Sequence, residues 1–338
     1  MDLLIFGGSG TISSSVVTQA LRQGIHVTAV KRTPGGMPDG VEVLCGDARD
    51  EDGLRALLAG RRFDAVAQFV AFTPQDVERD LRLFREKTSQ YLFISSASAY
   101  QKPLAAVPIT ESTPLHNPYW QYSRDKAACE DVLMQAWKQE GFPVTIVRPS
   151  HTYSRKKVPL AIHGDHGSWQ TLVRIREGRP IILPGDGTSL WTLTHADDFA
   201  RGFVGLLGNP RALGGAVHIT SDETMTWRQI YETIAQAMGR DLCAACVSSQ
   251  FLAVCDPGYD FRGQLLGDKA ANVQFDNTKI KRLVPGFACT VSMAQGLREA
   301  VAYALEHPEC QQEDPAFDAW CERILAAQAA ARQYFEEH

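Results

Sequence analysis

The sequence predicts an α/β fold, a doubly wound parallel sheet with a smaller C-terminal α/β lobe. Apolar, strand-like runs alternate with helix-like segments as far as Pro149, which is typical of a parallel sheet. Beyond Pro149 this alternation breaks into loops and shorter elements. The chain of 338 residues is long enough to bury a core in each part. We therefore expect a sheet domain formed by residues 1–150 and about 188–220, and a lobe formed by residues 151–187 and 221–338.

The chain opens with a short apolar run and a glycine-dense turn, followed by a segment with helical apolar spacing. Gly7 and Gly10 let the backbone turn tightly and approach a phosphate, whose charge the N–H groups of the helix N-terminus can meet. We expect Thr11 and Ile12, at the start of that helix, to line the same site. The pattern predicts the start of a Rossmann βαβ unit, although a plain strand-to-helix turn also uses glycine.

The second strand, expected over residues 25–30, is followed by Lys31 and Arg32. An acidic residue here would accept hydrogen bonds from a ribose 2′-hydroxyl, whereas a basic residue suits a 2′-phosphate. The pair therefore favours NADP as the cofactor, with NAD as the alternative. A solvated basic pair at a strand end would give the same pattern.

The third strand leads into Asp47 and Ala48, where a carboxylate can accept from an adenine amino group. Val70 follows the fourth strand, at the edge where open α/β sheets bind ligands. The strands after the second are expected over residues 41–44, 64–69, 91–95, 143–149, 192–195 and 216–219. Helices are expected over residues 14–21, 54–58, 78–87, 119–140, 169–177, 197–207, 226–238, 292–306 and 315–334.

Two further features point to chemistry at this edge. A serine-rich run follows the fifth strand, and Tyr122 and Lys126 lie four residues apart in the next helix, so they share one face. A nearby cation favours the phenolate form of a tyrosine, which can then exchange a proton at neutral pH. A serine hydroxyl can hold the same substrate oxygen.

In this order, the motifs resemble the extended (atypical) short-chain dehydrogenase/reductases of the NAD-dependent epimerase/dehydratase family. The likeness runs from Leu3 to about Leu207. The motifs that carry it are Gly7-x-x-Gly10, Gly46-Asp47, Ser95-Ser96-Ala97-Ser98-Ala99-Tyr100, Tyr122-x-x-x-Lys126, Arg148-Pro149 and Gly185-Asp186-Gly187.

The resemblance implies a role for each matching position. Gly7 and Gly10 would cradle the pyrophosphate, Asp47 and Ala48 would meet the adenine, and Pro149 would lie near the nicotinamide. Ser96 would bind the substrate oxygen, Tyr122 would be the acid/base, and Lys126 would hold the nicotinamide ribose. The implied activity is an NAD(P)-dependent oxidoreductase or epimerase acting on a carbinol carbon of a sugar or sugar-nucleotide-like substrate.

Four positions, at three places in the chain, depart from the family pattern. Ser13 replaces the third glycine of the turn. Dehydratases of this family resemble one another in having an acidic pair at the positions of Ala97 and Ser98. The absence of acidic residues there speaks against a 4,6-dehydratase. Trp191 stands where sugar-nucleotide members usually carry an arginine that grips the diphosphate. The indole either stacks on a substrate ring or is a packed aromatic residue. Ser98, Trp191 and Arg262 are therefore the candidate substrate contacts.

Composition argues against several other classes of function. The net charge of −5 gives no electrostatic footprint for nucleic-acid binding, and no apolar run is long enough to span a bilayer. Eight scattered cysteines suit a reducing cytoplasm, and Cys243 and Cys246 are expected to be buried thiols, so no metal site is predicted. The family implies a homodimer. The alternative function is a catalytically silent nucleotide-sensing or RNA-binding relative of the same fold.

Overall fold

The computed structural model describes all 338 residues, and its centre is a seven-stranded parallel sheet with the strand order β11-β6-β5-β4-β1-β2-β3. This order confirms the doubly wound α/β fold. The strands are β1 (Asp2–Phe6), β2 (His26–Lys31), β3 (Val41–Cys45), β4 (Ala65–Gln68), β5 (Tyr91–Ile94), β6 (Val144–Pro149) and β11 (Gly215–Ile219). In the register of the sheet, Leu3 lies between Val27 and Ala65.

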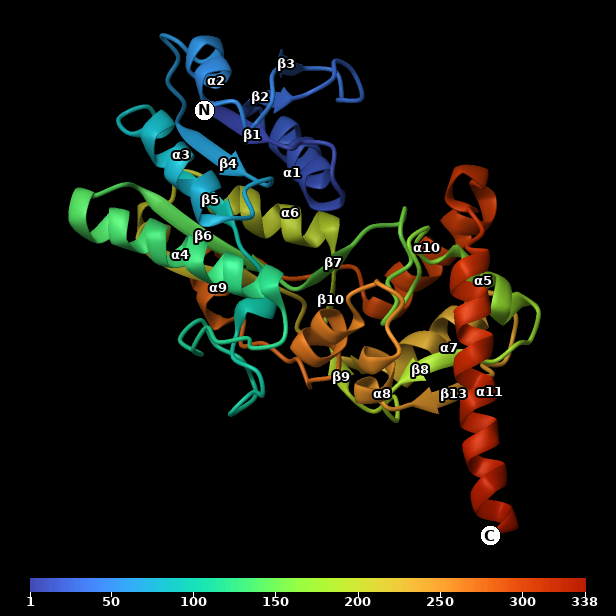
Figure 1. Ribbon diagram of the computed structural model, residues 1–338. Coiled ribbons are helices and arrows are strands. Elements are labelled where there is room, and N and C mark those ends of the chain that lie inside the picture. Colours follow the sequence, from blue (N-terminus) through green and yellow to red (C-terminus); the bar gives the residue numbers. More distant parts are fainter. The chain divides into compact units, whose positions relative to one another are not determined.

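Helices cover both faces of this sheet (Figure 1). One face carries α1 (Thr11–Arg22), α6 (Ala196–Gly205) and α9 (Thr278–Leu283), and the other carries α2 (Glu51–Leu57), α3 (Pro74–Phe84) and α4 (Gln121–Glu140). On the first face Val16 and Phe203 pack with Leu3 and Ile5, all of them buried. On the second face Leu83 and Leu133 pack against the opposite side of the strands. Alternating side chains of the buried strands therefore serve two cores.

The chain divides into two compact units. The first consists of residues 1–152, 194–222 and 275–290, and the second of residues 153–193, 223–274 and 291–338. The sequence-based division needs two corrections. Residues 188–193 belong to the second unit, and 275–290 belong to the first because α9 packs beside β11 and Ile280 joins its core.

The second unit contains two small sheets and several helices. Strand β8 (Ile181–Pro184) pairs in parallel with β13 (Ala244–Val247), and β9 (Leu190–Trp191) pairs antiparallel with β12 (Met225–Thr226). Its helices are α5 (Trp169–Arg176), α7 (Trp227–Ala237), α8 (Ser249–Val254), the π-helix η3 (Arg262–Lys269), α10 (Met293–Glu306) and α11 (Pro315–Glu337). The remaining short elements of the chain are β7 (His151–Tyr153), β10 (Leu193–His195), η1 (Ala97–Ala99), η2 (Pro210–Ala212) and η4 (Pro308–Cys310).

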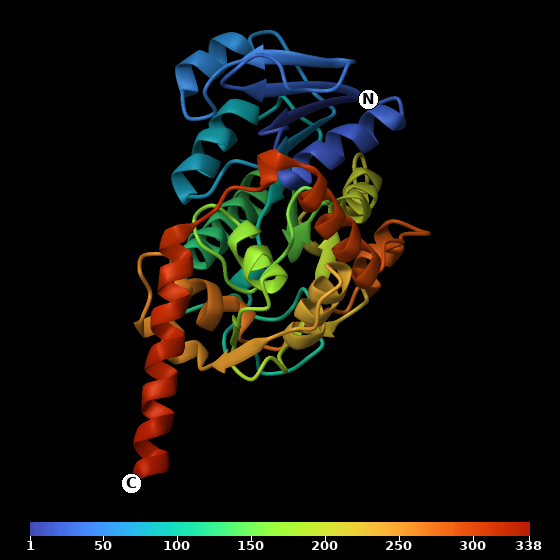
Figure 2. The ribbon, with the colours of Figure 1, turned by 90° about the vertical axis from the view of Figure 1, so that its right-hand side faces the viewer.

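Helix α11 packs only its first half. Phe317, Trp320 and Ile324 are buried in the core of the second unit, whereas residues 326–338 are exposed. Figure 2 shows this helix in red, with its C-terminal turns extending past the other elements of the unit. No helix of the chain is both long enough and apolar enough to span a bilayer.

Candidate functional site

The glycine turn between β1 and α1 has one position that only glycine fits. Gly7 has φ +82°, and a Cβ atom built on it would lie 2.4 Å from Cγ1 of Val70. Gly10 precedes the first turn of α1 in an extended conformation (φ −75°, ψ 170°) and has ordinary space around it. The backbone of this turn is therefore in close contact with Val70, two residues beyond the end of β4, and α1 begins directly after the turn.

Ser13, in place of the third glycine, stabilises the turn. Its side chain is 2% exposed, and its Oγ donates to the carbonyl of Gly7 (2.5 Å) and accepts from the N–H of Gly10 (3.0 Å). The substitution thus supplies hydrogen bonds that a glycine could not. This stabilising role of Ser13 was not predicted from the sequence.

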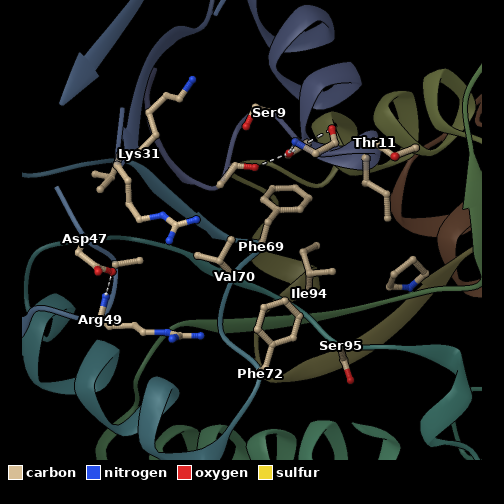
Figure 3. A pocket seen from close by; sticks show the side chains of 18 of the residues that line it. Ser9, Thr11, Lys31, Asp47, Arg49, Phe69, Val70, Phe72, Ile94 and Ser95 are labelled. Atoms are coloured by element: carbon tan, nitrogen blue, oxygen red, sulfur yellow. Dashed lines mark hydrogen bonds between the residues drawn. The ribbon is translucent and has the colours of Figure 1, made fainter. Parts of the chain in front are cut away.

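A cavity of about 970 Å³ lies at the carboxyl ends of the central strands, within the first unit. It brings together twelve of the predicted residues: Gly7, Gly10, Thr11, Ile12, Lys31, Arg32, Asp47, Ala48, Val70, Tyr122, Lys126 and Pro149. In Figure 3 Lys31, Asp47 and Arg49 lie on one side of this cavity and Ser95 lies toward the other, with Val70 between them. Residues as far apart in the chain as Gly7 and Pro149 therefore line one site.

The side of the cavity formed by β2 and β3 is basic. Lys31, Arg32 and Arg49 all line it, and Nζ of Lys31 donates to the carbonyl of Gly35 at 2.5 Å. Asp47 accepts from the backbone N–H of Arg49 at 2.9 Å through Oδ1. Sequence reasoning missed Arg49. Its place two residues after Asp47, beyond the end of β3, was the signal that could have found it.

Lys126 lies deep in the wall of the cavity. It is 1% exposed, and its Nζ donates to the carbonyls of Ala71 (2.8 Å) and Ile94 (2.7 Å). Nζ also lies 4.6 Å from the ring centroid of Phe72 and 5.8 Å from that of Tyr122. Burial lowers the pKa of this ammonium group to about 8. The lysine thus joins the ends of β4 and β5 and places its positive charge beside the half-buried Tyr122.

The serine run contributes both a lining residue and a buried cluster. Ser95 lines the cavity, and its Oγ donates to Oε1 of Glu130 at 2.5 Å. The half-buried Ser96 lies just beyond, with its Oγ 2.8 Å from that of Ser98. Ser98 is 4% exposed and also accepts from Oγ of Ser123 at 2.7 Å. This arrangement places Ser98 behind Ser96, which differs from the direct substrate contact predicted from the sequence. Neither Ser95 nor Ser123 had been singled out.

The other two predicted substrate residues lie in the second unit. Trp191 is 1% exposed and stacks on Trp227, with ring centroids 5.2 Å apart and an angle of 27° between the planes. This geometry favours the packed-aromatic alternative over stacking on a substrate. Arg262 is exposed at the start of η3. No group of three or more His, Cys, Asp or Glu side chains gathers as a metal site.

Two proteins of known name match most of this chain in sequence. The 2′-dehydrokanamycin reductase of Streptomyces kanamyceticus is 29% identical over 255 residues, which are 75% of this chain and 71% of that protein. The chloroplast stem-loop binding protein of 41 kDa b from Arabidopsis thaliana is 27% identical over 253 residues, 70% of this chain and 63% of that protein.

Solved structures share the fold. The UDP-glucuronic acid 4-epimerase of Bacillus cereus, in complex with UDP-glucuronic acid and NAD, superposes with a TM-score of 0.72 at 19% identity, covering 90% of this chain and 99% of that one. The sequence profile of the NAD dependent epimerase/dehydratase family matches residues 3–219. Because this match spans more than half of the sequence and includes the glycine turn, Tyr122 and Lys126, the chain belongs to the NAD-dependent epimerase/dehydratase family.

Proposed function

We propose that this protein is an NADP(H)-dependent oxidoreductase that interconverts a carbonyl and a carbinol on a sugar or sugar-nucleotide-like substrate. The observation that carries the proposal is that Tyr122 and Lys126 line the same cavity as the glycine turn. A proton-transferring group and a dinucleotide cradle thus face one space, which the chemistry requires.

The residues of the cavity fit a dinucleotide. The glycine backbone at Gly7 leaves no room for a side chain, and the N-terminus of α1 offers N–H groups to a pyrophosphate. Lys31, Arg32 and Arg49 supply three cations for a ribose 2′-phosphate, which supports NADP over NAD. When bound, the nicotinamide supplies or accepts the hydride.

The chain's own groups would handle the proton and the substrate oxygen. In the reducing direction Tyr122 gives its phenolic proton to the carbonyl oxygen as the carbonyl carbon gains a hydride, so that C=O becomes CH–OH. Ser96 donates a hydrogen bond to the same oxygen. The ammonium group of Lys126 stabilises the phenolate that is left on Tyr122.

We favour a reductase over an epimerase. The basic cavity wall suits NADPH, which must exchange at every turnover of a reductase, and the relative from Streptomyces kanamyceticus is named 2′-dehydrokanamycin reductase. Trp191 in place of the usual arginine leaves no cation at that position for a diphosphate. A homodimer assembled through α4 and a cytoplasmic location belong to the same proposal, the latter because all eight cysteines are free thiols.

The test uses the purified full-length chain. Mass spectrometry identifies any nucleotide that co-purifies, and absorbance at 340 nm follows the oxidation of NADPH with 2′-dehydrokanamycin as the keto probe. Epimerisation of UDP-glucose with NAD leaves the cofactor unchanged overall, so it is followed separately by chromatography of the sugar nucleotides. We expect one NADPH to be oxidised for each keto probe reduced. The Tyr122→Phe variant should lower the rate of this oxidation by about 100-fold or more. Unchanged turnover in Tyr122→Phe would remove the catalytic assignment. Tightly retained NAD with UDP-glucose epimerisation would favour an epimerase, and a gel shift with a stem-loop RNA but no turnover would favour the silent RNA-binding alternative.

A further inference from the structure

Three serine hydroxyls form a continuous chain in the first unit, from the first turn of α4 to the end of β5. Oγ of Ser123 donates to Oγ of Ser98 at 2.7 Å, and Oγ of Ser98 lies 2.8 Å from Oγ of Ser96. Ser123 immediately follows Tyr122 in α4, so the chain connects the two catalytic segments. The exposed fraction rises along it, from 0% at Ser123 and 4% at Ser98 to the half-buried Ser96.

Burial fixes the direction in which these hydroxyls donate. A buried O–H left without an acceptor costs free energy, and the acceptor for the Ser123 proton is Oγ of Ser98. Ser98 is itself enclosed, so its own proton must go to the remaining neighbour, Oγ of Ser96. Every bond therefore points from the buried end of the chain toward the half-buried end.

The last hydroxyl, that of Ser96, can act toward a ligand only as a hydrogen-bond donor. Oγ of Ser96 accepts from the hydroxyl of Ser98 and also from the backbone N–H of Ser98, at 3.2 Å. A hydroxyl oxygen has two lone pairs and one proton, so both acceptor positions of Ser96 are then used. Its free proton is what it can offer to a ligand.

We propose that Ser98 and Ser123 are positioning residues that make Ser96 an obligatory hydrogen-bond donor toward the substrate oxygen. This inference rests on the proposed function and narrows its substrate. A fixed donor is matched by a carbonyl oxygen or a developing alkoxide, both of which accept only, and it needs no rearrangement when charge builds up on that oxygen. The site is thereby specialised for the keto form of the substrate.

The backbone around the chain keeps its geometry fixed. Asn117 donates from Nδ2 to the carbonyl of Ser98 at 2.7 Å, and its Oδ1 accepts from the N–H of Tyr119 at 3.1 Å. These bonds tie η1, which holds Ser98, to the segment that enters α4. A hydroxyl removed from the chain is thus not replaced by a simple shift of the loop.

A stability experiment tests the chain without any substrate. In Ser98→Ala the buried Ser123 hydroxyl loses its acceptor, whereas in Ser98→Ala/Ser123→Ala no donor is left unsatisfied. We expect the melting temperature of the double variant to lie above that of Ser98→Ala, and Ser123→Ala to be the mildest single change. If the losses in melting temperature of the two single variants add up in the double variant, the inferred direction of donation from Ser123 to Ser98 is overturned.

An activity experiment tests the role of Ser96, with NADPH and 2′-dehydrokanamycin as the probe. Without Ser123 the Oγ of Ser98 has an unused acceptor position, so Ser96 can donate to Ser98 and is no longer held as a donor toward the substrate. We expect kcat to fall about 3- to 10-fold in Ser123→Ala while KM stays within about twofold. Thr145→Val is the matched control, because Thr145 also carries a buried hydroxyl with two hydrogen bonds in this unit. Thr145 lies in β6, and its partners are Gln90 and Ala212, not the three serines.

The outcomes separate the two proposals. A wild-type kcat in Ser123→Ala, or an equal loss in Thr145→Val, overturns the positioning role even if Tyr122→Phe is inactive and the proposed function stands. If the wild-type enzyme does not turn over the probe, the proposed reaction fails for that compound, and the melting temperatures alone decide whether the directed serine chain exists.

Discussion

At the scale of single residues, the site depends on a glycine that has two independent reasons to be glycine. Gly7 combines a left-handed φ of +82° with a contact that leaves no space for a Cβ atom, 2.4 Å from Val70. Val70 cannot move away easily, because its N–H donates to Oε1 of Gln68 at 2.9 Å and the amide of Gln68 is held by the buried Asp80 at 2.7 Å. The turn is therefore supported from behind by a buried polar network.

Replacing this glycine should damage both the fold and cofactor binding. We expect Gly7→Ala to lower the free energy of unfolding by about 2–5 kcal/mol, from left-handed strain and overpacking together. Gly24→Ala is the control, since Gly24 has φ +71° but no atom within 4 Å of a new Cβ. It should lose only about 1–2 kcal/mol. Urea titration and NADPH binding measure both effects, and equal losses in the two variants would show that the Val70 contact is unimportant.

Lys126 should leave a signature in the pH dependence of stability. Its pKa is about 8 in the folded chain, against 10.5 for the free side chain, because burial disfavours the charged form. Between these values the unfolded chain binds more protons, so this residue makes the protein more stable as pH rises from 8 to 10.5, by up to about 3 kcal/mol.

The comparison of Lys126→Met with the wild type isolates this contribution. Urea titrations at pH 7.5 and at pH 10 give the free energy of unfolding of both proteins. We expect the value for the wild type to increase relative to that of Lys126→Met between pH 7.5 and pH 10. Lys138→Met, at an exposed position of the same helix, is the control and should track the wild type at both pH values. A constant difference between wild type and Lys126→Met would mean that the lysine is not desolvated.

At the scale of elements, α4 is held to the sheet by one buried ion pair. Glu130 accepts from Arg148 through Nε (2.9 Å) and Nη2 (2.5 Å), and it also accepts the hydroxyl of Ser95. Glu130 and Arg148 are 3% and 5% exposed. The helix that carries Tyr122 is thereby joined to β6 and to the end of β5, beside the cavity.

Breaking this pair should cost far more than breaking an exposed pair on the same helix. We expect Glu130→Gln to lower the free energy of unfolding by about 3–5 kcal/mol, because Arg148 then remains buried without a countercharge. Glu140 pairs with Arg85 at the other end of α4, where the side chains are 44% and 58% exposed, and Glu140→Gln should change stability by less than about 1 kcal/mol. Chemical denaturation of both variants decides whether burial sets the difference.

The elements that the sequence predicted are those with long, regular patterns. The strands of the central sheet and the helices that cover it were predictable because buried parallel strands are continuous apolar runs and amphipathic helices are periodic. Strands β8 and β13 have four residues each and α9 has six, and all three lie beyond Pro149, where the regular alternation of strands and helices has ended. Each is stabilised by a partner distant in sequence, as Ala244 is by Ile181.

The site was also predictable only in part: the positions of its residues could be predicted, but most of their side-chain contacts could not. Positions at the ends of strands are fixed by topology, so twelve predicted residues meet in one cavity. Side-chain contacts inside the wall were not predictable. The roles of Ser13 and Ser123 depend on which hydroxyl faces which, and Trp191 is covered by Trp227 from a helix 36 residues later. Such contacts are products of packing and leave no local pattern.

At the scale of the whole molecule, the first unit is assembled from three separate stretches of the chain. Residues 1–152 supply six strands of the sheet, but β11, α6 and α9 arrive only with residues 194–222 and 275–290. These late elements contribute Phe199, Phe203 and Val217 to the core that also contains Leu3, Ile5 and Val16. The stretch of residues 1–152, which carries the glycine turn, is thus incomplete as a folding unit.

The isolated fragment of residues 1–152 should therefore not fold on its own. Without α6 and β11, the face of the sheet that α1 also covers exposes part of its apolar side chains, and β6 becomes an open edge. We expect the purified fragment to show no cooperative thermal transition, to bind a hydrophobic dye and to lack NADPH binding, whereas the full chain unfolds cooperatively and binds the cofactor. A cooperative transition together with NADPH binding in the fragment would show that residues 1–152 form a complete core and that the later segments are not needed for folding.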